Sequence, residues 1–167
     1  NGFDWLVLPG VEKRDGVYVP RRLPGTLSET VALRSLILGA ALAGFAPDLV
    51  IVDRHPLGIR RELEAPLRAL RRSHPEARIV LGLRDVLDDP GVAAREWEGL
   101  GGADTLVPLV DQVWVYGDPR VHDATSSGEI PPALASRALF TGYLAAGRTD
   151  VDPYPGRLSR PYVLTTA

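Results

Sequence analysis

The sequence predicts an α/β protein with a Rossmann-like parallel sheet and flanking helices. Three short apolar runs each end in a charged or glycine-containing turn, and helical patterns lie between them. The runs are 49–52 before Asp53-Arg54-His55, 78–83 before Arg84-Asp85, and 112–116 before Gly117-Asp118. Strands that alternate with helices are typical of a parallel sheet. Because the runs are continuously apolar, we expect their strands to be buried on both faces.

The amino-acid composition of the chain excludes several kinds of function. The chain has 167 residues and an apolar fraction of 45%, which suits a globular protein with a core of its own. Its formal net charge of −2 argues against broad electrostatic binding of nucleic acid. The lack of cysteine excludes disulfides, thiolate zinc sites and a cysteine nucleophile. These features fit a cytoplasmic protein, which is the location we expect.

The amino-terminal part is expected to hold a strand, a loop and one long helix. Residues 4–8 are strand-like, and residues 9–25 are rich in Pro, Gly and charge, which predicts a surface loop. Thr26-Leu27-Ser28-Glu29 fits a capping box, which predicts a helix to about Phe45. Beyond Ser35 this helix is apolar nearly all round, which predicts deep burial. The apolar stretch is shorter than the ~20 residues that span a bilayer, so we expect no transmembrane segment and leave peripheral membrane contact open.

Several residue patterns in the rest of the chain predict helices. Residues 58–72 look helical, and Pro66 either kinks this helix or stands near its start. Asp89-Pro90 and Asp118-Pro119 each predict a cap followed by a first helical residue, with helices to about Leu100 and Gly128. A short helix is expected at 131–137 and a last strand at 139–143.

Both ends of the chain are strand-like, so we expect a fragment of a larger protein. The predicted organisation is a Rossmann-like domain at 1–144 that is incomplete at its start, a linker at 145–161, and at 162–167 the first strand of a further domain. A sheet cut in this way would expose edge strands, which favours self-association.

The common catalytic signatures are missing. The sequence has no G-x-G-x-x-G, Walker, G-x-S-x-G or H-E-x-x-H motif, and its three scattered histidines make a poor zinc site. We therefore expect no metal and no cofactor bound by this chain itself.

The polar residues at the strand ends are the candidate site. Ligands of parallel sheets bind at the carboxyl ends of the strands. Carboxylates and guanidinium groups bind sugar hydroxyls, arginine suits phosphate, and an imidazole can move a proton near neutral pH. We predict catalytic roles for His55 and Asp53. The predicted substrate-binding residues are Arg54, Arg84, Asp85, Gly117 and Asp118.

Structural explanations compete with each of these roles. Asp118 fits a helix cap, Arg84 and Asp85 can form an ion pair that fixes a loop, and His55 can satisfy backbone groups in its turn. The tryptophans Trp5, Trp97 and Trp114 are expected in the core or an interface rather than in a sugar-stacking platform.

Four segments resemble a family of predicted bacterial glycosyltransferases related to the MurG and glycosyltransferase-28 group. They are Pro-Asp-Leu-Val-Ile-Val-Asp-Arg-His-Pro-Leu-Gly at 47–58, Val-Leu-Gly-Leu-Arg-Asp-Val-Leu-Asp at 80–88, Val-Tyr-Gly-Asp-Pro at 115–119 and Phe-Thr-Gly-Tyr-Leu at 140–144. Their order and spacing agree, so the resemblance covers most of the chain.

The resemblance implies a GT-B enzyme with two Rossmann-like domains, in which the amino-terminal domain takes the acceptor and the other holds the nucleotide-sugar. It implies no metal for the chemistry. It would make this chain the later part of the amino-terminal domain, with the family's glycine- and histidine-containing loop upstream of Asn1. The strand-end residues would then face the acceptor.

The expected function is therefore a fragment of a glycosyltransferase that moves a sugar from a nucleotide-sugar donor to a hydroxyl of a small-molecule or glycan acceptor. The fragment alone would be inactive. The alternative is a non-catalytic module that binds a small sugar or phosphate, and a hydrolase or epimerase on the same fold is a third reading. Fold alone does not decide among these.

Overall fold

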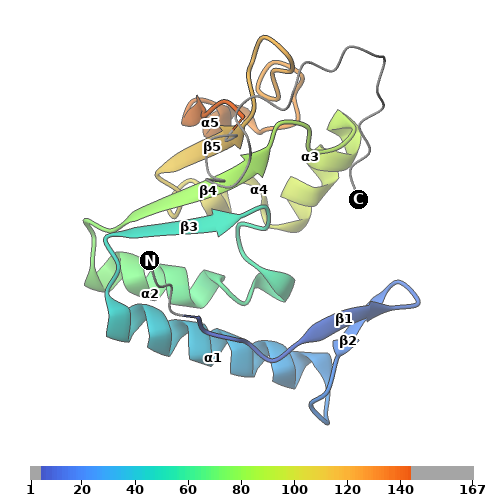
Figure 1. Cartoon of the computed structure of the whole chain (residues 1–167), viewed down its shortest axis with the longest axis vertical. Helices are drawn as coiled ribbons and strands as arrows, with labels where there is room; N and C mark the ends of the chain where they lie inside the picture. Colours follow the sequence, from blue (N-terminus) through green and yellow to red (C-terminus); the bar gives the residue numbers. More distant parts are fainter. Residues whose placement is uncertain (1–4, 144–167) are drawn as a thin grey trace, which may run out of the picture.

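A parallel sheet of four strands organises the protein (Figure 1). The structure is a computed structural model and describes residues 5–143. The strands are β3 (Leu49–Asp53), β4 (Arg78–Arg84), β5 (Gln112–Tyr116) and β6 (Ala138–Phe140), which lie side by side in this order and are all parallel. The predicted Rossmann-like α/β class is confirmed. The predicted linker at 145–161 and strand at 162–167 lie outside the described residues.

One face of the sheet carries the hydrophobic core. The register sets Val52 beside Leu81, and Leu81 beside Val113, so their side chains share a face. The helices α2 (Glu64–Ser73), α3 (Pro90–Gly99), α4 (Gly102–Leu106) and α5 (Pro132–Ala135) complete this cluster. They contribute Leu67, Trp97, Leu106 and Leu134. Each of these side chains is less than about one-tenth exposed, and such burial is worth about 1.5–3 kcal/mol for each large apolar side chain.

The opposite face of the sheet is partly open. Leu49 and Ile51 of β3 are 47% and 48% exposed, and Leu139 of β6 is 49% exposed. β4 is buried on both faces as predicted, because it has a neighbour on each side. The same prediction is wrong for β3, since this strand ends the sheet and no described helix covers its outer face.

Helix α1 (Leu27–Phe45) begins with the predicted capping box. Thr26 Oγ1 accepts from the Glu29 amide at 3.2 Å, and Glu29 Oε2 accepts from the Thr26 amide at 2.7 Å. The prediction of deep burial is wrong, because Thr30 is the one buried residue of this helix. α1 packs with one side on α2, while Leu36 and Phe45 on its surface are 73% and 82% exposed (Figure 1). Among residues 5–143, no element covers most of the apolar surface of α1.

α1 also has the length and composition of a membrane-spanning helix. It has 19 residues and a mean hydropathy of 1.3, and it is the one helix among residues 5–143 that reaches these limits. The apolar stretch from Ser35 to the helix end at Phe45 is therefore only part of this helix. Core helices and signal sequences meet the same limits.

An ion pair anchors α1 to the chain that follows β3. Arg34 Nη2 donates to Glu62 Oε1 at 2.7 Å, and Arg34 Nη1 donates to the Pro9 carbonyl at 2.7 Å. The side chains of Arg34 and Glu62 are 12% and 4% exposed. The pair therefore holds α1, the amino-terminal segment and the loop after β3 together.

The amino-terminal segment differs from its prediction. Residues 5–8 are irregular rather than a strand. Residues 9–25 contain the hairpin of β1 (Val11–Arg14) and β2 (Val17–Pro20) instead of a plain loop. Its turn is Asp15-Gly16, with φ of 49° and 82°. Positive φ at both positions is typical of a type I′ hairpin turn, for which Asp-Gly is a preferred pair.

Two helix predictions have different outcomes. Around Pro66, a short 3₁₀ turn η1 (Ile59–Arg61) precedes α2, so Pro66 lies in the first turn of α2, where proline is tolerated. The helix predicted over 119–128 is replaced by turns. The carboxylates of Asp118 and Asp123 accept from the amides of Arg120 and Thr125 two residues on, and such local bonds compete with a helix.

Candidate functional site at the carboxyl edge of the sheet

The loop that follows β3, residues 53–63, concentrates backbone strain. Five non-glycine residues of the described chain have positive φ, and three of them lie in this loop. They are Arg54, Arg60 and Arg61, with φ of 63°, 51° and 65°. Each such residue costs on the order of 1–3 kcal/mol, and strain of this kind clusters at binding and catalytic sites. We call this segment the β3 loop.

A tight turn positions the first three residues of the β3 loop. The His55 amide donates to the Asp53 carbonyl at 2.7 Å across Arg54, and the Arg54 amide donates to the Gly82 carbonyl of β4 at 2.8 Å. With positive φ at its centre, this is the strained form of the three-residue γ-turn. The Arg54 guanidinium lies 3.8 Å from the Glu96 carboxylate of α3. The turn thus places the polar side chains of Asp53, Arg54 and His55 together at the carboxyl end of β3.

Asp53 and His55 line a groove between β3 and α1. The groove has a volume of about 410 Å³, and Leu38 and Leu42 of α1 form part of its apolar wall. Both polar residues are exposed, and neither side chain makes a hydrogen bond or ion pair within residues 5–143. No group among residues 5–143 therefore competes with a ligand for this carboxylate and this imidazole.

Tyr116 of β5 joins this group, which the sequence analysis did not foresee. A Cβ atom on Gly82 would lie 2.2 Å from the Tyr116 hydroxyl, so the tyrosine ring crosses β4 over Gly82. Gly82 is the register partner of Asp53. Burial raises the pKa of Tyr116, and the charge of Asp53 raises it further, so Tyr116 stays a neutral donor beside the carboxylate. A glycine within the apolar run at 78–83 was the available signal.

A second group forms at the ends of β4 and β5. The Tyr143 hydroxyl donates to Asp85 Oδ2 at 3.1 Å. A Cβ atom on Gly117 would lie 2.5 Å from Asp85 Cβ, so the close approach of these two turns requires glycine. The Asp118 charge also acts on Tyr143. Tyr143 is a further residue that the sequence analysis placed only in a strand.

The structural explanations for the charged residues of this second group have different outcomes. The ion pair that competes with ligand binding at Arg84 and Asp85 does not form within the described residues. Asp118 instead pairs with Arg120, whose Nη2 lies 2.5 Å from Asp118 Oδ2. Bonds from the Arg120 side chain and amide lower the pKa of Asp118 to about 2. Asp118 therefore caps a turn, while Arg84 remains exposed at its strand end.

The loop after β5, residues 117–131, is held by a buried carboxylate that the sequence analysis missed. Glu129 is 2% exposed and accepts from the Leu87 amide at 2.7 Å, from Ser127 Oγ at 2.7 Å and from His122 Nε2 at 2.5 Å. Burial alone would raise the pKa of Glu129, but these bonds outweigh it and lower the pKa below its usual value. We call this segment the β5 loop. The Leu87 amide that Glu129 binds lies 42 residues away in the sequence, so no local sequence pattern predicted the contact.

The predicted site residues thus fall into two groups. Asp53 and His55 share one groove with Tyr116 nearby, whereas Asp85, Gly117 and Asp118 gather around Tyr143. No side-chain hydrogen bond or ion pair within residues 5–143 joins the two groups. Arg54 pairs with Glu96 of α3, and Arg84, the register partner of Tyr116, is exposed at the end of β4. Carboxylate, imidazole and phenol groups of this kind bind hydroxyls and move protons.

Metal chemistry has no obvious place among these groups. Within residues 5–143, no three His, Asp or Glu side chains lie close enough together to hold a metal ion.

Comparisons with known proteins add no relative. No protein-family model matches this chain, and no curated protein or solved structure matches it.

Proposed function

We propose that this chain is the acceptor-binding part of a glycosyltransferase that uses a nucleotide-sugar donor. The sugar would pass to a hydroxyl of a small-molecule or glycan acceptor, and the donor would bind to a second domain. The proposal rests on the glycosyltransferase-like segments at 47–58, 80–88, 115–119 and 140–144 and on the polar groups at the strand ends.

The observation that carries the proposal is the pair Asp53 and His55. Within residues 5–143 both side chains lack partners, flank the strained residue Arg54 and line one groove, and Tyr116 lies near Asp53. Exposed polar groups that no described protein group engages, beside a strained backbone, favour ligand contact over a structural role.

Polar side chains at the strand ends have distinct roles in the proposed reaction. Asp53 accepts a hydrogen bond from the acceptor hydroxyl, and His55 takes its proton as the oxygen attacks the anomeric carbon. The bond from that carbon to the donor phosphate breaks, and the nucleoside diphosphate leaves with the electron pair. Arg54 and Arg84 are the cations nearest the strand ends that can stabilise the developing negative charge.

A transfer assay tests this proposal. The protein expressed from its full gene is incubated with a panel of nucleotide-sugars and hydroxyl acceptors, and glycosylated product is measured by mass spectrometry. We expect transfer by the full-length protein and none by these 167 residues alone.

Asp53→Ala should lower kcat/KM by about 100-fold, which is the range for loss of one proton-handling or orienting group. Asp104→Ala is the matched control, because Asp104 is exposed on α4 and has no side-chain partner. Transfer by the 167 residues alone, or equal activity of both variants, would overturn the proposal.

A further inference from the structure

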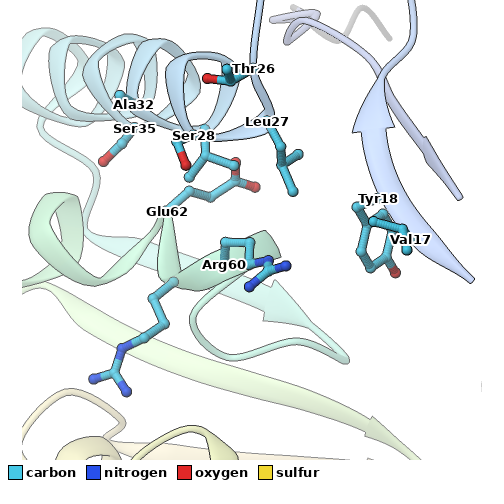
Figure 2. A pocket seen from close by; sticks show the side chains of 11 residues that line it. Val17, Tyr18, Thr26, Leu27, Ser28, Ala32, Ser35, Arg60 and Glu62 are labelled. Carbon is cyan, nitrogen blue, oxygen red and sulfur yellow. The ribbon is translucent and has the colours of Figure 1, made fainter.

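A second hollow on the described residues lies outside the groove of Asp53 and His55. It has a volume of about 670 Å³ and lies between the β1–β2 hairpin, the first turns of α1 and the β3 loop (Figure 2). Tyr18 of β2, Leu27 and Val31 of α1 and Arg60 of the β3 loop form its walls. We call it the Arg60 hollow.

Arg60 brings an uncompensated positive charge to this hollow. Two other charged side chains line it, but both are paired: Glu62 with Arg34, and Arg61 with Glu64 at 2.8 Å. Arg60 makes no hydrogen bond or ion pair within residues 5–143, and Figure 2 shows its guanidinium beside the open space that Leu27 and Tyr18 flank. The net charge of the lining is therefore positive.

The backbone holds Arg60 in place at a cost. Its φ of 51° is in the left-handed region, which a residue with a Cβ rarely adopts. The neighbouring Arg61 fixes the loop, because its guanidinium donates to the Leu100 carbonyl at 2.8 Å as well as to Glu64. Arg60 thus projects from a constrained backbone rather than from a flexible one.

The rest of the lining combines hydroxyl groups with an apolar surface. Ser28 and Ser35 of α1 line the hollow opposite Arg60, and neither side chain has a hydrogen-bond partner within the described residues (Figure 2). The capping box of Thr26 and Glu29 engages the Glu29 amide at the start of α1. Arg60 supplies the positive charge for an anion in this hollow, and the serine hydroxyls offer further donors.

We propose that the Arg60 hollow binds a small organic phosphate. A guanidinium can hold two phosphate oxygens, and the Ser28 hydroxyl can donate to a remaining oxygen. Leu27, Val31 and Tyr18 offer the apolar contact for the organic part. This site is separate from the proposed acceptor groove and does not depend on glycosyl transfer.

Calorimetric titration with phenyl phosphate tests the site. The wild-type chain should bind one equivalent, and it should bind inorganic phosphate and benzyl alcohol more weakly, because each offers only half of the recognised chemistry. Arg60→Asn removes the charge while asparagine tolerates the left-handed backbone, so the Kd should rise at least about 10-fold. Arg60→Lys should retain more binding than Arg60→Asn.

Two further variants separate this site from general charge and from misfolding. Arg72→Asn is the matched control, because Arg72 is an exposed arginine of α2 without a partner, and it should bind like wild type. Ala32→Trp keeps every charge but fills part of the hollow, so it should weaken binding. Circular dichroism would confirm that each variant folds.

Absence of saturable binding to the wild type would overturn the proposal. Equal affinity of wild type and Arg60→Asn, or an equal loss in Arg72→Asn, would do the same. Each of these results would leave the glycosyltransferase proposal untouched, because its readout is product formation.

Discussion

Two loops at the same edge of the sheet differ in how many of their charged side chains are paired. In the β5 loop, Asp118, Asp123 and Glu129 all bind groups within the protein. In the β3 loop, Arg54, Arg61 and Glu62 are paired, but Asp53, His55 and Arg60 make no side-chain hydrogen bond or ion pair within residues 5–143. Both loops are rich in charge and each contains a histidine, so composition does not separate them. Unpaired charge beside a strained backbone favours ligand binding at the β3 loop, whereas internal pairing favours a structural role for the β5 loop.

The largest expected effect on stability comes from the β5 loop. Glu129→Ala leaves the Leu87 amide, Ser127 and His122 without their shared acceptor. The free energy of unfolding should fall by about 3 kcal/mol, since three hydrogen bonds to a buried carboxylate are lost and a hydrogen bond to a charged group is worth about 1.5–3 kcal/mol. Urea unfolding measures this change. Glu98→Ala, at an exposed position of α3, should change it by less than about 0.5 kcal/mol. A loss no larger than the control's would mean that the Glu129 network does not hold the loop.

The β3 loop should respond in the opposite direction. Arg60→Gly relieves the left-handed strain without breaking a contact, so the free energy of unfolding should rise by about 0.5–1 kcal/mol. Arg72→Gly, in the last turn of α2, should instead lower it, by up to about 1 kcal/mol. The same unfolding assay gives both values. Destabilisation by Arg60→Gly would show that the arginine side chain stabilises its loop and is not held there at a cost.

The smallest effect is a pH dependence of the β5 loop. Hydrogen bonds from Ser126 and Thr125 lower the pKa of Asp123 to about 2, and Arg120 does the same for Asp118. Because the pKa of each carboxyl in the folded protein lies below the usual 3.8, its contribution to the free energy of unfolding is fully present above pH 3.8. This contribution is lost as the pH falls towards 2. Carboxyl carbon shifts followed by NMR should show both midpoints near 2. Midpoints near 3.8 would rule out the internal pairing.

The sequence carried enough information for the sheet, because each strand is a continuous apolar run between turn residues. It also located both ends of α1 and the start of α3, where Thr26 with Glu29 and Asp89 with Pro90 act through contacts only two or three residues apart. The predicted burial of α1 and β3 was wrong, because burial depends on whether another helix or strand covers the element. Apolar composition does not say whether such an element is present.

The candidate site was predictable to a similar extent. Asp53 and His55 were found because polar residues after a strand must lie at its carboxyl end. Tyr116 and Glu129 were missed because their contacts cross the sheet or span 42 residues. The groups at the ends of β4 and β5 were found, but their pairing with Tyr143 and Arg120 depends on how the turns pack.

The two histidines give the most direct test of the difference between the loops. Transfer by the full-length protein and urea unfolding would be measured for His55→Ala and His122→Ala. His55→Ala should lower kcat by about 100-fold and leave the free energy of unfolding unchanged, because the His55 side chain makes no hydrogen bond or ion pair with the described part of the chain. His122→Ala should lower the free energy of unfolding by about 1–3 kcal/mol and retain transfer, because it removes a partner of buried Glu129. Loss of transfer in a well-folded His122→Ala variant, with full activity in His55→Ala, would contradict the assignment of function to the β3 loop.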